Sequence, residues 1–143
     1  MDREKLAENI QTFVPLMFRK IMKVFPTFEI SKQQIGLLFH VKHDNKKPMN
    51  FYSDKMMIPR SNLTVISDKL IEEGYIQRLY DPSDRRVVIL EITSKGEECL
   101  NGYKEKVKKE MIKRLDVLND EDIKRLNVLL EEMKTIFNKV DPN

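Results

Sequence analysis

Side chains that suit the edges of DNA bases are concentrated between residues 60 and 65. They are Arg60, Ser61, Asn62, Thr64 and Val65. An asparagine amide can form two hydrogen bonds with adenine, valine can contact the thymine methyl group, and serine or threonine can bond a base or a phosphate. Arg60 could serve either a phosphate or a guanine. These residues could instead only solvate a helix start, but the N-terminal residues of a recognition helix are the ones that read bases.

A second cluster of charge lies in the segment DPSDRR, residues 81–86. Arginine is favoured in the narrow, electronegative minor groove, so Arg85 and Arg86 are candidates for a DNA contact. Asp84 and Arg86 are two residues apart, and they share a face if the strand begins here. The segment could also be a solvated turn, whose surface ion pair would contribute less than about 1 kcal/mol.

The first of these clusters lies on a predicted helix over residues 59–73. Leu63, Ile66 and Leu70 fall on one face of that helix, and Gly74 ends it in a left-handed conformation. We place Pro59 as the residue that opens the helix, where a missing N–H costs little. A short helix over 50–57 comes just before, and the tight connection near Ile58 gives helix-turn-helix spacing.

The second cluster joins two predicted strands. The runs YIQRLY (75–80) and VVILEI (87–92) are rich in β-branched and aromatic residues. The six residues 81–86 connect them, so we expect a two-stranded ribbon, or wing, directly after the helix-turn-helix.

Four longer helices account for the rest of the chain. We expect one over residues 3–24 with a kink at Pro15, one that starts at Ser31 and ends within 43–48, one over about 95–116, and one over about 120–140. Ser31 and Gln34 form a capping box, and Asn119 is a helix cap. The outer helices carry more apolar surface than a small core can bury, which favours a two-fold dimer over a larger monomeric core.

Bulk composition excludes several classes of protein. The chain has 143 residues with a net charge of +3, which suits one domain and does not by itself indicate nucleic-acid binding. Cys99 is the only cysteine, so no intramolecular disulfide is possible. No apolar run reaches the length of a membrane span, and the start MDREKLAENI is unlike a signal peptide, so we expect a cytoplasmic protein. No catalytic motif or cofactor-binding motif is present.

The segment 58–96 resembles the DNA-binding core of MarR-type transcriptional regulators. Their pattern has a Ser/Thr-rich recognition helix, a D-x-x-D-R-R wing and then Leu-Thr-x-x-Gly. The residues that match this pattern are Asp81, Asp84, Arg85, Arg86, Ile92, Thr93 and Gly96. Met57 stands where a glycine is common in the turn, and Pro59 replaces a usual serine cap.

This resemblance implies a mainly α fold with a small β-wing, in which long N- and C-terminal dimerisation helices flank a winged helix-turn-helix core. We expect one MarR-type domain over 1–143, with the core at 30–96 and dimerisation helices at 1–28 and 97–143. The resemblance further implies that Arg85 reaches DNA while Asp84 holds Arg86 as a brace. It implies a homodimer on a pseudo-palindromic operator, with the recognition helices roughly 34 Å apart.

The family also implies a small aromatic or lipophilic effector bound between the dimer helices and the winged core. Phe13, Met17, Phe39 and His40 are the residues that could line such a pocket, although apolar stripes are more often ordinary core. His40 and His43 lie three residues apart but make an incomplete metal site, so no metal is predicted. Cys99 near a helix start could have a lowered pKa.

The sequence therefore predicts a sequence-specific DNA-binding regulator, a homodimeric repressor whose DNA binding responds to a small molecule. The alternative is a winged-helix module that binds another protein and not DNA. Only the charge balance favours this alternative, because residues 52–96 carry seven basic and seven acidic side chains.

Overall fold

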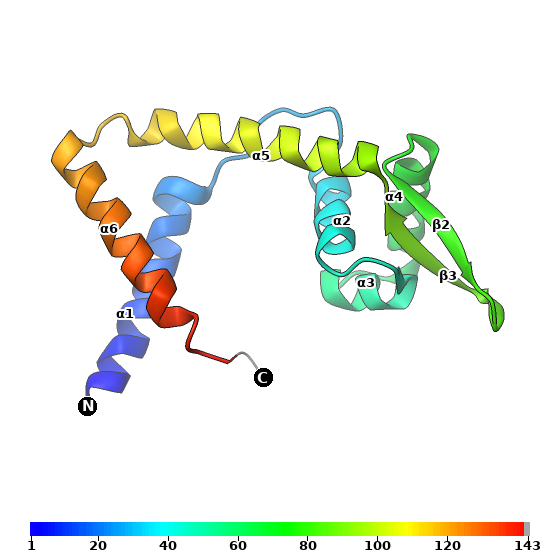
Figure 1. Ribbon diagram of the computed structural model, residues 1–143, viewed down its shortest axis with the longest axis horizontal. Coiled ribbons are helices and arrows are strands. Elements are labelled where there is room, and N and C mark those ends of the chain that lie inside the picture. Colours follow the sequence, from blue (N-terminus) through cyan, green and yellow to red (C-terminus); the bar gives the residue numbers. More distant parts are fainter. Residues whose placement is uncertain (142–143) are drawn as a thin grey trace. The chain divides into compact units, whose positions relative to one another are not determined.

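The computed structural model describes residues 1–141, which form helices and a small antiparallel sheet (Figure 1). The elements are α1 (Asp2–Met17), the π-helix η1 (Phe18–Met22), α2 (Lys32–His43), β1 (Lys47–Pro48), α3 (Met49–Met56), α4 (Arg60–Glu72), β2 (Ile76–Asp81), β3 (Asp84–Ile92), α5 (Ser94–Leu115) and α6 (Asp120–Phe137). The predicted fold class, mainly α with a small β-wing, is confirmed.

The chain divides into two compact units. One, which we call the winged unit, spans Phe25–Val107, and the other, the helical unit, combines Met1–Val24 with Lys108–Asn143. The predicted organisation, one domain with a core at 30–96 and dimerisation helices on either side, stays a prediction. The last two residues of its C-terminal segment, 142–143, lie outside the described residues.

The core of the winged unit is built on the predicted cap and apolar stripes. Ser31 accepts a hydrogen bond from the backbone N–H of Gln34, whose side chain accepts one from the Ser31 N–H, so the capping box is complete. Three helices and the sheet contribute fully buried side chains to this core, among them Leu37, Leu38, Val41, Tyr52, Leu63, Leu70 and Leu90. These side chains pack α2, α3 and α4 around one hydrophobic core.

The sheet differs from the predicted two-stranded ribbon in two ways. It has three strands in the order β1-β3-β2, because Lys47 pairs with Leu90 and Pro48 with Ile89. A two-residue strand that contains proline carries no pattern that sequence inspection could detect, and Pro48 is tolerated since it lies at the sheet edge. The strands β2 and β3 also extend into the predicted loop, which shrinks to the turn at Pro82 and Ser83.

A glycine fixes the junction between the wing and α5. A Cβ placed on Gly96 would lie 2.1 Å from the carbonyl oxygen of Tyr75, so no larger residue fits without moving the backbone of the wing. Thr93 adds to this junction by donating its hydroxyl hydrogen to the Gly74 carbonyl at 2.6 Å. The wing therefore leaves the core from a rigid base, and Figure 1 shows β2 and β3 as a hairpin that projects beyond it.

The first helix continues through Pro15 and then widens. Pro15 lies inside α1, and the α-helix gives way to the π-helix η1 at Phe18, so the chain remains helical to Met22 instead of Val24. A proline cannot donate the usual hydrogen bond to the residue four positions earlier, and π-helical turns absorb such irregularities. Neither α1 nor α6 contains a buried residue.

Candidate nucleic-acid interface

The helix α4 presents the predicted base-reading residues to solvent. Leu63 and Leu70 are fully buried and Ile66 is nearly so, which anchors one face of the helix in the core. Its opposite face begins with a row of exposed residues, namely Arg60, Ser61, Asn62, Thr64 and Val65. Val65 is 69% exposed, although a β-branched apolar side chain gains nothing from water there. The row is at the N-terminal end of α4, where a recognition helix meets base edges.

The turn before α4 has two unusual backbone features. Met57 adopts a left-handed conformation with φ 56°, which costs a non-glycine residue about 1 kcal/mol or more. Pro59 is extended and serves as the N-cap, so the first helical residue is Arg60 and the prediction that Pro59 opens the helix is wrong by one position. The extended Pro59 leaves α4 without a side-chain cap, and the first N–H groups of the helix stay free.

Arg60 is the residue of this row that is tied to the preceding helix. Its Nη1 donates a hydrogen bond to Oδ1 of Asn50, on α3, at 2.5 Å. The Thr64 hydroxyl donates to the Arg60 carbonyl oxygen at 3.0 Å and can still accept a bond from DNA. Within residues 1–141, the side chains of Ser61 and Asn62 have no partner, so all their donors and acceptors are available to a base.

The wing tip contains a backbone irregularity at the two arginines. Tyr80 pairs with Val88, and the next residue, Asp81, pairs with Asp84. Three residues of β3 therefore have no paired residue on β2. These three are Arg85, Arg86 and Val87. Simple alternation of side chains, which the sequence argument assumed for the two arginines, does not apply across such a bulge.

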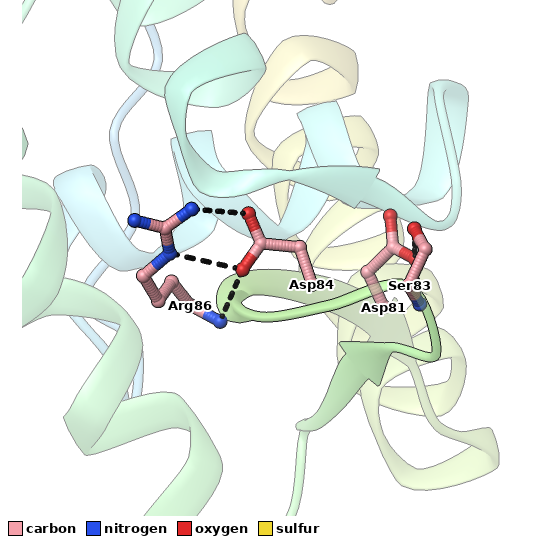
Figure 2. A network of polar contacts seen from close by, with 4 residues as sticks. All are labelled: Asp81, Ser83, Asp84 and Arg86. Carbon is pink, nitrogen blue, oxygen red and sulfur yellow. Dashed lines mark hydrogen bonds and ion pairs between the residues drawn. The ribbon is translucent and has the colours of Figure 1, made fainter.

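Asp84 holds this bulge together. Its carboxylate accepts hydrogen bonds from Nε and Nη2 of Arg86, at 3.1 and 3.2 Å, and from the Arg86 backbone N–H at 3.0 Å (Figure 2). The backbone bond satisfies an N–H group that the strand pairing leaves without a partner. The Asp84–Arg86 ion pair that the sequence suggested is thus present, and its place as a brace in a DNA complex stays a prediction.

A second carboxylate closes the turn itself. Asp81 accepts hydrogen bonds from the hydroxyl and the backbone N–H of Ser83, at 2.6 and 2.9 Å (Figure 2). These bonds lower the pKa of Asp81, and the bonds from Arg86 lower the pKa of Asp84, so both carboxylates stay charged at a lower pH than an ordinary aspartate. Above the usual pKa of an aspartate the wing tip therefore keeps its full set of charge-assisted bonds.

Arg85 differs from its neighbour in having no partner in the described part of the chain. The charge of Arg86 is largely matched by Asp84, although the Arg86 side chain is 91% exposed. Arg85 is exposed too, and all of its donors are free. Of the two arginines, Arg85 is the one with charge available for a groove.

Ion pairs within the protein match part of the acidic charge of this region. Asp68 on α4 pairs with Arg78 on β2 at 2.8 Å, and Glu91 pairs with Lys46 at 3.4 Å. These acids are thus matched within the protein. Lys47 has no ion pair among residues 1–141, and its Nζ lies 5.7 Å from the centre of the Phe51 ring, so its charge is available to a phosphate.

The four residues predicted for an effector pocket fall in different units. Phe13 and Met17 lie on α1 in the helical unit, whereas Phe39 and His40 lie on α2 in the winged unit. A pocket that they share stays a prediction. Phe13 lines a groove of about 430 Å³ within the helical unit, together with the α1 and α6 side chains Leu6, Asn9, Ile10, Met133, Ile136 and Phe137. In the winged unit, Phe39 packs edge-on against Tyr103 at 6.3 Å.

Cys99 does not have the low pKa suggested by its place near a helix start. Burial and the carboxylate of Glu29, 3.7 Å from its sulfur, raise the pKa of Cys99 to about 11. The described residues contain no group of three or more side chains able to hold a metal ion. No helix between residues 1 and 141 is long and apolar enough to cross a membrane.

Comparisons with known proteins point to transcriptional regulators. The family model "Transcriptional regulator SarA/Rot" matches residues 18–103, which cover the winged unit almost completely. The HTH-type transcriptional regulator YpoP of Bacillus subtilis is 23% identical over 134 residues, which is 92% of this chain and 95% of that protein. The expectation that the chain is not an enzyme is confirmed by these relatives.

Solved structures show the same fold. The transcriptional regulator Tm0710 of Thermotoga maritima is 26% identical, with a TM-score of 0.68 over 96% of this chain and 95% of that one. The structure of Streptococcus pneumoniae FabT in complex with DNA is 20% identical, with a TM-score of 0.55 over 97% of this chain and 99% of that one. The second likeness supports the fold alone.

Proposed function

The chain belongs to the SarA/Rot family of transcriptional regulators, with a DNA-binding winged helix-turn-helix of MarR type, and on this premise we propose that it is a homodimeric repressor modulated by a small molecule. The observation that carries the proposal is the exposed row at the start of α4, which stands opposite a fully buried apolar face. A helix held in this way can enter the major groove without losing core packing.

In this proposal, reading of the operator is divided between helix and wing. Asn62 pairs with an adenine and Val65 contacts a thymine methyl group, while Ser61 and Thr64 bond bases or phosphates. Arg85 enters the minor groove, where the potential is most negative, and Asp84 fixes Arg86 to keep the wing tip in one shape. The free donors of Arg85 and the matched charge of Arg86 support this division.

The homodimer follows from the apolar surface of the helical unit. Neither of its outer helices buries a side chain, yet α6 carries a stripe of exposed apolar residues, Ile123, Leu126, Leu130 and Phe137, and the exposed Val140 follows just beyond its end. A second copy supplies an equal and self-complementary stripe, which is how two-fold dimers bury such surfaces. Two copies also present two recognition helices to a pseudo-palindromic operator.

In this proposal the effector is an aromatic or lipophilic molecule, and Phe13, Met17, Phe39 and His40 are its candidate contacts. The groove at Phe13 and the aromatic pair of Phe39 with Tyr103 offer apolar surface suited to such a molecule. Its binding releases the operator only if it prefers the state of the dimer that cannot bind DNA. Repression follows if the occupied operator overlaps a promoter.

Selection of bound duplexes from a random DNA pool tests the proposal. We expect a two-fold symmetric consensus with half-sites about one helical turn apart, and a complex of two chains per duplex by sedimentation. A screen of aromatic acids and lipophilic compounds against that duplex then identifies molecules that release it. Absence of any DNA binding at low salt would contradict the proposal as a whole, and binding by a monomer would contradict its dimeric part.

A further inference from the structure

The hydrogen bond between Arg60 and Asn50 joins the two helices of the helix-turn-helix at the edge of the proposed DNA surface. Asn50 lies in the first turn of α3, and Arg60 is the first residue of α4. Both residues are exposed, and Nη1 of Arg60 donates to Oδ1 of Asn50 at 2.5 Å. No core packing requires this bond, since neither side chain is buried. It instead fixes where the guanidinium group stands.

We propose that Asn50 is a positioning residue that holds Arg60 against the DNA backbone, so that Arg60 binds a phosphate and does not read a base. This inference rests on the proposed function. It assigns a role to Asn50, and it decides between the phosphate and the guanine that the residue type alone allows for Arg60.

The position of α3 favours a phosphate contact for Arg60 over a contact with guanine. In a helix-turn-helix, the second helix lies in the major groove while the first helix crosses the sugar–phosphate backbone. A guanidinium that is tied to the first helix is therefore drawn away from the base edges and toward the backbone. The residues that follow it on α4, Ser61 and Asn62, have no such tie and stay free to face the groove.

The hydrogen-bonding capacity of both side chains fits this role. A guanidinium has five N–H donors, and Asn50 occupies one of them, which leaves four for phosphate oxygens. The Asn50 Oδ1 is occupied by Arg60, so it leaves fewer free acceptor sites that could repel a phosphate beside the guanidinium. Lys47 and Lys55 flank the Phe51 ring of the same helix, 5.7 and 5.5 Å from its centre, and add positive charge to this side of the unit.

The test compares Arg60→Ala, Asn50→Ala and the double variant on two duplexes. One duplex is the sequence selected from the random pool, and the other has an unrelated sequence. A phosphate contact predicts that Arg60→Ala weakens binding to both duplexes by a similar factor, on the order of tenfold, and lowers the salt dependence of binding by about one unit of slope. Asn50→Ala should act in the same direction but less, and it should have no further effect once Arg60 is absent.

Lys69→Ala serves as the matched control, because Lys69 is an exposed cation nine residues beyond Arg60 on the same helix, without a side-chain partner among residues 1–141. It should change affinity by less than about twofold. Circular dichroism melts of each variant confirm that the fold is intact.

Two results would overturn the inference while leaving DNA binding in place. If Arg60→Ala relaxes the selected consensus at one guanine, Arg60 reads a base. If Asn50→Ala weakens binding equally with and without Arg60, Asn50 does not act through Arg60. If the unaltered protein binds neither duplex, the proposed function itself fails, and that outcome differs from both of these.

Discussion

The winged unit and the helical unit have similar apolar periodicity but very different burial. In the winged unit, the stripes of α2 and α4 meet one another and the sheet, and residues such as Leu37 and Leu63 are fully shielded from water. In the helical unit, Val24 is the only buried residue among those described, and the stripe of α6 is exposed along its length. Apolar residues spaced three and four apart therefore show which face of a helix must be buried, but not which element or partner buries it.

This difference teaches that the two units depend on different interactions for stability. The winged unit has the packing of a self-sufficient core, so its stability should not depend on protein concentration. The helical unit lacks such packing in a single chain, so its order should depend on association. Substitutions in the winged unit should accordingly change the free energy of unfolding, whereas substitutions in the helical unit should change self-association.

The largest effect is expected from Leu63→Ala in the winged unit. Leu63 is fully buried, and truncation of a buried leucine costs about 2–5 kcal/mol of unfolding free energy. Chemical denaturation at two protein concentrations should show the same loss at both. Val65→Ala, two residues away on the exposed face, is the control and should change stability by under about 0.5 kcal/mol. Equal losses for the two variants would mean that α4 is not anchored as described.

The next largest effect is expected from Leu130→Glu in the helical unit. Leu130 lies on the α6 stripe and is 42% exposed in one chain, so a charge there costs little until a partner covers it. We expect self-association to weaken by at least tenfold, about 1.4 kcal/mol or more, as measured by sedimentation equilibrium. Val128→Glu makes the same change on the opposite face of α6 and should leave association unaltered. A dimer that survives Leu130→Glu would place the interface elsewhere.

A smaller effect that leaves both units folded is expected at the wing. Arg85→Ala should weaken operator binding by about 1–2 kcal/mol and lower its salt dependence, without changing the melting temperature or the dimer. Arg86→Ala should have a smaller effect on the salt dependence, because Asp84 already matches its charge. Titration of the two variants on one duplex at several salt concentrations separates these outcomes. A larger loss for Arg86→Ala would reverse the roles of the two arginines.

A structural feature could be predicted from the sequence where residues close together in the chain determine it. The helices, the capping box at Ser31, the cap at Asn119 and the left-handed Gly74 were all predictable, because neighbours in sequence decide them. The strand at Lys47 was not, since it exists only through pairing with β3. The contact of Arg60 with Asn50 was missed for the same reason. Two polar residues ten positions apart give no signal until the turn between α3 and α4 brings them together.

The smallest effect, and one of opposite sign, is expected from Met57→Gly in the turn between α3 and α4. Met57 holds a left-handed backbone with φ 56° and exposes 90% of its surface, so its side chain contributes almost no packing to offset the strain. Glycine adopts this conformation without steric cost, and we expect the winged unit to gain about 0.5–1 kcal/mol of unfolding free energy. Because the gain lies wholly in the winged unit, the midpoint of denaturation should rise while the association constant stays the same. A rise in both would show that the stabilities of the two units are coupled, and a fall in the midpoint would show that the Met57 side chain has a packing role that its exposure conceals.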